Sequence, residues 1–105
     1  MAEKTLLEKL EGLQHKFDEI STLITDPSVI SDQKRYVKLN KEYHELERIL
    51  TAKNEYELKL SHLAEAKEVL DTENDPEMRE MAKMEIDSIE PLIPEMEENI
   101  KLLLI

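Results

Sequence analysis

The sequence contains no cysteine, no tryptophan and a single glycine, Gly12, among its 105 residues. Without cysteine it has no disulfide framework and no thiolate metal site. One glycine excludes a glycine-rich phosphate-binding loop, and so little glycine argues against a turn-rich sandwich or barrel. The first residues show no basic segment followed by an apolar stretch, and the sequence has no apolar run long enough to span a bilayer. We therefore expect a soluble, cytoplasmic protein with no membrane partner.

Acidic residues dominate the charge of the chain. Charged residues make up 37% of the chain, and its net charge is −11. Residues 65–105 carry 13 acids and 4 bases, whereas residues 1–64 carry 12 acids and 10 bases. This balance weighs against gripping nucleic-acid phosphates, which needs clustered Lys and Arg, so we expect no direct sequence-specific nucleic-acid readout. Two interpretations of the acidic end remain, a solvated face or a surface for a basic protein partner.

Apolar residues recur every three or four positions along most of the chain, which predicts amphipathic helices. The stripes are Leu6, Leu10, Leu13, Phe17, Ile20 and Ile24; Tyr36, Leu39, Tyr43, Leu46, Leu50, Tyr56, Leu60, Leu63 and Leu70; Met78, Met81, Ile86 and Ile89; and Ile93, Met96, Ile100 and Leu103. We expect helices over residues 4–25, 31–71, 76–89 and 92–104. The pattern leaves Glu97 on an exposed face.

The fold class follows from the length of the second helix. An isolated helix of about forty residues needs an antiparallel neighbour to bury its stripe. The apolar period slips near Lys53, so a strict heptad is not sustained. The predicted fold is therefore all-α: an elongated antiparallel helical hairpin, coiled-coil-like, with an additional N-terminal helix.

Acids occupy every second position from Asp71 to Glu77, just before a run rich in methionine. A calcium-binding loop starting at Asp71 would need glycine at its sixth position and a carboxylate at its twelfth, where the chain has Pro76 and Ala82. A helix start fits better, with Asp75 as N-cap and Pro76 at the first helical position. Asp75 and Arg79 can also pair across one turn.

Prolines and an apolar run at the end of the sequence mark the other helix boundaries. Asp26 before Pro27 predicts the cap of a short turn, and Ser31 or Asp32 can cap the next helix. Pro91 and Pro94 predict a break or kink near residues 88–92. The final apolar run, residues 102–105, is either tucked against the first helix or a sign that the polypeptide normally continues.

Catalysis finds little support. His15, His44 and His62 are the only plausible general bases near neutral pH, and each lies among Glu and Lys away from any nucleophile motif. We expect surface histidines, no catalytic, cofactor-binding or metal-binding residues, no cofactor, and no enzyme activity.

Tyrosines and methionines are the remaining candidates for binding. Tyr36, Tyr43 and Tyr56 could stack on bases, but their place on the apolar stripe favours packing with wet hydroxyls. The methionines could form an adaptable docking surface. Helical spacing puts Met78 and Met81 in the core first and leaves Met84 as the better surface candidate.

Four stretches together resemble the N-terminal domain of bacterial class I peptide chain release factors of the type that reads UAA and UAG. They are "LLEKLEGLQHKFDEISTLI", "SDQKRYVKLNKEYHELE", "DPEMREMAKMEI" and the "LLL" of residues 102–104. The family's working motifs are a Gly-Gly-Gln loop and a Pro-x-Thr tripeptide, and neither exists in this chain. No catalytic or codon-reading residue can therefore be carried over.

The resemblance implies an accessory domain acting in translation termination. Such a domain would contact the ribosome at the stalk base of the large subunit, through its protein and RNA, and communication with the GTPase release factor is a further expectation. The alternative is a generic antiparallel coiled-coil interaction or structural protein whose likeness to release factors is coincidental.

Overall fold

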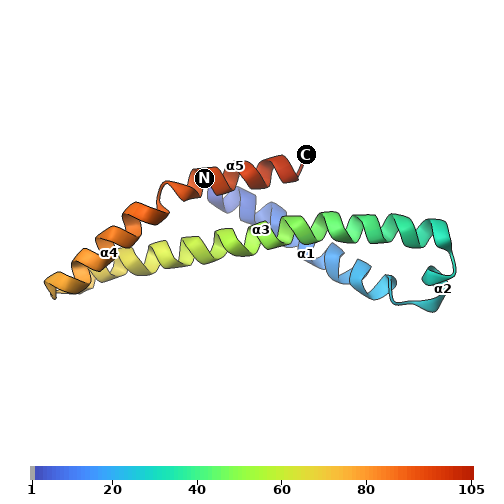
Figure 1. Cartoon of the computed structure of the whole chain (residues 1–105), viewed down its shortest axis with the longest axis horizontal. Coiled ribbons are helices and arrows are strands. Elements are labelled where there is room, and N and C mark those ends of the chain that lie inside the picture. Colours follow the sequence, from blue (N-terminus) through green and yellow to red (C-terminus); the bar gives the residue numbers. More distant parts are fainter. Residues whose placement is uncertain (1) are drawn as a thin grey trace. The chain divides into compact units, whose positions relative to one another are not determined.

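The computed structural model describes residues 2–105, with side chains from Thr5 onward. The described chain is all-α and contains α1 (Ala2–Leu23), α2 (Pro27–Ile30), α3 (Gln33–Thr72), α4 (Pro76–Ile89) and α5 (Leu92–Leu103) (Figure 1). The predicted fold class is confirmed. None of the described helices is long and apolar enough to cross a membrane.

The chain divides into two compact units, Met1–Lys53 and Asn54–Ile105, and the boundary falls within α3. In the first unit, α1 and the N-terminal half of α3 run in opposite directions (Figure 1). The Phe17 ring of α1 stacks on the Tyr43 ring of α3 with 4.8 Å between centroids. Beside them, Lys16 Nζ lies 2.9 Å from Glu42 Oε1. The buried side chains of this unit are Leu6, Leu10, Ile20, Val29, Leu46, Ile49 and Leu50.

The reversal in the first unit is built on the two predicted aspartate caps. Asp26 has extended backbone angles, and its Oδ1 accepts hydrogen bonds from the Ser28 backbone N–H and the Ser28 hydroxyl, both at 2.9 Å. These two hydrogen bonds, the backbone one first, hold the pKa of Asp26 below its usual 3.8 because they favour the carboxylate. Asp32 Oδ1 accepts a hydrogen bond from the Arg35 backbone N–H at 3.3 Å, so α3 also begins on an aspartate.

In the second unit, the C-terminal half of α3 and α4 form an antiparallel hairpin (Figure 1). The acid run between them is a helix start, as predicted: Asp75 Oδ1 accepts the Glu77 backbone N–H at 3.0 Å, with Pro76 first in α4. The expected pairing of Asp75 with Arg79 is wrong. The Arg79 guanidinium instead donates to the carbonyl oxygens of Leu70 and Glu73. Carbonyls in the last turn of a helix have no intrahelical partner, so this arginine binds α4 to the end of α3.

The break before the last helix lies at Pro91. Helix α4 ends at Ile89, and α5 begins at Leu92. Pro94 is the third residue of α5, in the first turn, where the missing N–H would have no intrahelical partner, so the helix continues through it. The buried side chains of this unit are Tyr56, Ala66, Ala82, Ile89 and Ile100. At the end of α5, Leu102 is 62% exposed and Ile105 fully exposed, while Leu103 and Leu104 are half-buried.

Two expectations about polar groups in the second unit are wrong. The Tyr56 ring is fully buried as expected, but its hydroxyl donates to Glu97 Oε2 at 2.7 Å rather than to water. Glu97 is accordingly half-buried, although its sequence position placed it on an exposed face. The other two tyrosines, Tyr36 and Tyr43, are half-buried, in agreement with the prediction.

Candidate docking surface

The three histidines lie on α1 and α3. His15 and His44 are exposed on α1 and α3, in agreement with the prediction, whereas His62 is half-buried. His44 Nδ1 lies 3.8 Å from Glu47 Oε1 on its own helix, a contact typical of a solvated helix face. Among the side chains that the structure describes, no group of three or more His, Asp or Glu is arranged to hold a metal ion.

Three methionines of α4 lie on the surface of the second unit. Met78, Met81 and Met84 are 45%, 70% and 65% exposed. The expectation that Met78 and Met81 pack in the core is therefore wrong, while Met84 is a surface residue as predicted. The buried face of α4 is set by Ala82 and Ile89, which are 5% and 4% exposed. The short alanine side chain lets that face lie close to its neighbour, and the longer methionines are left at its margins.

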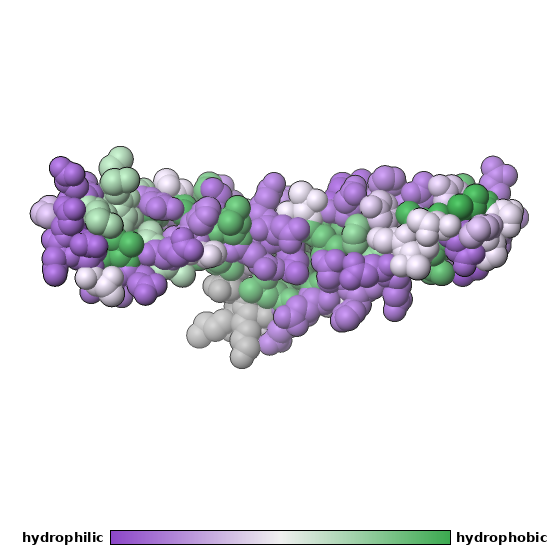
Figure 2. Space-filling view, turned by 90° about the horizontal axis from the view of Figure 1, so that it is seen from below, coloured by the Kyte–Doolittle hydropathy of each residue, from purple (hydrophilic) through white to green (hydrophobic). Residues whose placement is uncertain are grey.

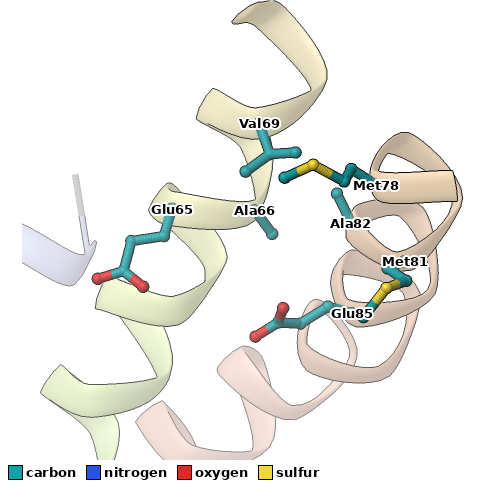
Figure 3. Close-up of a pocket in the computed structure, with 7 residues that line it drawn as sticks. All are labelled: Glu65, Ala66, Val69, Met78, Met81, Ala82 and Glu85. Atoms are coloured by element: carbon teal, nitrogen blue, oxygen red, sulfur yellow. The ribbon is translucent and has the colours of Figure 1, made fainter. Parts of the chain in front are cut away.

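An open groove of about 280 Å³ lies between α3 and α4. Its lining residues are Glu65, Ala66, Val69, Met78, Met81, Ala82 and Glu85. In Figure 3, Ala66 and Val69 of α3 face α4, and Met78 reaches across from α4 toward Val69. The floor is therefore made of small and β-branched side chains, and the flexible thioethers form one wall.

Carboxylates flank this groove on both helices. Glu65 lies on the α3 side and Glu85 on the α4 side (Figure 3), and both residues are exposed. The unit around them, residues 54–105, carries 15 acids and 5 bases. One of those bases, Lys67, is already 3.4 Å from Glu90. Figure 2 shows that hydrophilic residues cover most of one face of the molecule, with separate patches of apolar residues between them.

This arrangement suits binding rather than chemistry. Methionine side chains adapt to irregular partner surfaces because they are unbranched and polarisable. A rim of carboxylates around them favours a partner with positive charge and disfavours nucleic-acid phosphates. We define residues Glu65, Met78, Met81, Met84 and Glu85 as the methionine surface.

Sequence reasoning identified the methionines but not the groove. Ala66, Val69 and Ala82 were absent from the predicted stripes because small residues carry a weak apolar signal. The available signal was the spacing of Ala82, Ile86 and Ile89, which recur by four and three.

Comparison with known proteins assigns the chain to a family. Its residues 13–105 match the family model described as the PCRF domain. Over its whole length the chain is 57% identical to a protein named peptide chain release factor 1 from Parabacteroides distasonis. Proteins of the same name from Bacteroides fragilis and Flavobacterium psychrophilum are 55% and 45% identical over 96% and 95% of the chain.

The matches cover nearly all of this chain but only part of each relative. The chain spans 28% of the P. distasonis and F. psychrophilum proteins and 27% of the B. fragilis protein. No solved structure matches the chain. Identity of this extent confirms the resemblance inferred from the sequence and rules out a coincidental likeness between unrelated coiled coils. Because the family model matches most of its residues, the chain belongs to the PCRF domain family.

Proposed function

We propose that this chain is the N-terminal accessory domain of a class I peptide chain release factor, acting in translation termination at UAA and UAG codons in the cytoplasm. The observation that carries the proposal is 57% identity along the whole chain to a release factor of which the chain spans 28%. The chain's only glycine is Gly12, so it has no Gly-Gly-Gln loop, and it also lacks Pro-x-Thr. Its part in termination is therefore binding, without catalysis or codon reading.

The partner that we propose is the stalk base of the large ribosomal subunit, with the GTPase release factor as a second partner. Ribosomal proteins expose many basic side chains, and the 15 acids of residues 54–105 complement them. The methionine surface supplies the apolar contact that charge alone does not provide. Met81, at 70% exposure, would bury the most new surface on docking.

The test is a binding titration of the labelled chain against large ribosomal subunits, with and without the stalk-base protein, at two salt concentrations. We expect saturable binding that requires this protein and that weakens as salt rises, because exposed charges are screened. The proposal of independent docking fails if subunits with and without the protein bind equally, or if neither binds at the highest concentration reached.

A matched pair of variants tests the surface itself. The triple variant Met78→Ser, Met81→Ser and Met84→Ser removes the exposed thioethers, and we expect it to weaken subunit binding at least about tenfold. The control is Ile30→Ser with Leu58→Ser, which changes two other apolar side chains that are 51% and 55% exposed. Equal weakening by both variants would show that the α4 methionines are not the docking surface. Circular dichroism melts of each variant check that the helices are retained.

A further inference from the structure

The beginning of α3 carries a cluster of positive charge in an otherwise acidic protein. Residues 33–41 contain Lys34, Arg35, Lys38 and Lys41 and no acid. All four basic residues are exposed. We define Lys34, Lys38 and Lys41, with Arg35 beside them, as the basic face.

Helix geometry places the three lysines on one side of α3. They are spaced by four and three residues, so their side chains emerge within one stripe. At a rise of 1.5 Å per residue the stripe is about 10 Å long. None of these lysines is within ion-pair distance of a carboxylate among the side chains that the structure describes.

Acids of the first unit lie near both ends of this stretch. After the Ser28 hydrogen bonds, the charge of Arg35 also lowers the pKa of Asp26, so this arginine is partly compensated. Asp32 accepts the Arg35 backbone N–H at the start of the helix, and Glu42 is bound to Lys16 at 2.9 Å. Glu45 is exposed on the same stripe, one turn beyond Lys41. Residues 33–41 therefore carry four positive charges that the acids of the first unit compensate only in part, although the net charge of the chain is −11.

We infer that the basic face binds the phosphate backbone of RNA. Lysine is a compact, strongly hydrated cation that binds phosphates as a point charge. The only exposed large apolar side chain within the stretch is Val37, so the face offers little for the core of a protein interface. The positive end of the α3 dipole lies at the same place and adds to the attraction. This inference rests on the proposed function, which brings the chain to the ribosome, where RNA is the abundant polyanion.

The proposed contact between the basic face and RNA does not depend on the base sequence of the RNA. Phosphate contacts fix position and orientation on a nucleic acid, whereas base edges carry the sequence information. The only side-chain amides within residues 33–41 are Gln33 and Asn40, and Asn40 is half-buried. An acidic surface on residues 54–105 for protein and a basic face on residues 33–41 for RNA would give the domain two chemically distinct contacts.

The experiment measures binding of the fluorescently labelled chain to protein-free large-subunit ribosomal RNA between about 50 and about 200 mM monovalent salt. Three lysine–phosphate contacts predict that log K falls against log salt with a slope of about −2 to −3. The variant Lys34→Gln, Lys38→Gln and Lys41→Gln should lose at least about tenfold in affinity at the lowest salt and nearly all of the slope.

The matched control is Lys9→Gln, Lys83→Gln and Lys101→Gln, which removes the same charge from exposed lysines elsewhere. We expect it to bind the RNA within about threefold of the unchanged chain. The inference is overturned if the unchanged chain does not bind this RNA at the lowest salt, or if the two triple variants lose affinity equally.

Parallel titrations with intact large subunits separate this inference from the proposed function. Binding to subunits without binding to RNA overturns the inference and leaves the proposed function standing. Weaker subunit binding by the basic-face variant, with RNA binding unchanged, also overturns it and shows that the lysines contact ribosomal protein.

Discussion

The Tyr56 hydroxyl of α3 donates a hydrogen bond to the Glu97 carboxylate of α5 at 2.7 Å, across 41 positions of sequence. The tyrosine ring is fully buried, and the carboxylate is half-buried. A buried ring with a bonded hydroxyl fixes the register of two helices more strictly than apolar contact alone, because only one relative placement satisfies the polar atom.

This hydrogen bond should be measurable by urea unfolding. We expect Tyr56→Phe to lower the free energy of unfolding by about 1–2 kcal/mol. A hydrogen bond to a charged group contributes more to stability than one between neutral groups, and the partial exposure of Glu97 reduces that contribution. Glu97→Gln keeps an acceptor oxygen and should cost less. Tyr36→Phe is the control, because Tyr36 is half-buried and forms no side-chain hydrogen bond in the described structure. A loss from Tyr36→Phe equal to that from Tyr56→Phe would contradict the assignment.

Three leucines of α3 provide a graded test of burial. Leu46 is 6% exposed, Leu63 is half-buried and Leu58 is 55% exposed. Truncation to alanine should cost about 2–4 kcal/mol at Leu46, about 1–2 kcal/mol at Leu63 and no more than about 0.5 kcal/mol at Leu58. Chemical denaturation followed by circular dichroism checks the order. A variant Leu58→Ala as costly as Leu46→Ala would show that the buried face of α3 lies elsewhere.

Gly12 offers a stabilising substitution. It lies within α1, its φ is not positive, and a Cβ added there would meet nothing within 4 Å. Gly12→Ala should therefore raise the free energy of unfolding by about 0.5–1 kcal/mol, because alanine loses less backbone entropy in a helix. Gly12→Pro is the opposite control and should cost about 3 kcal/mol or more. An unchanged melting temperature for Gly12→Ala would mean that α1 is not helical at this position in solution.

The Asp26 cap of α2 should make the stability of the protein depend on pH. The pKa of Asp26 lies below 3.8 because Ser28 donates two hydrogen bonds to the carboxylate. With the folded pKa below the unfolded one, the contribution of this cap is fully present above about pH 3.8 and is lost as pH falls through the folded pKa. Carboxyl-carbon nuclear magnetic resonance titration measures the pKa directly. Ser28→Ala removes the hydroxyl donor and should raise it toward 3.8, and a pKa above 3.8 in the unchanged chain would contradict the geometry.

Local chemistry explains why the helix boundaries could be predicted. The side-chain caps at Asp26 and Asp75, each followed by proline, act within three residues of sequence, so their effect does not depend on the fold. The break at Pro91 is local in the same sense, because the ring removes a backbone donor of its own residue. Residue-level function was less accessible, since a docking surface is made of exposed side chains that no local rule distinguishes from solvated ones.

The sequence by itself determined an all-α chain and the positions of its turns, because 3.6-residue periodicity and capping are encoded in neighbouring residues. Its membership of the PCRF domain family came from its likeness to known proteins. Only the tertiary structure decided which side chains are buried on α4, where Ala82 lies inside and Met81 outside. It also decided that Arg79 binds the end of α3 instead of Asp75, and that Tyr56 meets Glu97. These choices depend on where a second helix lies, and the apolar pattern of one helix tolerates more than one such placement.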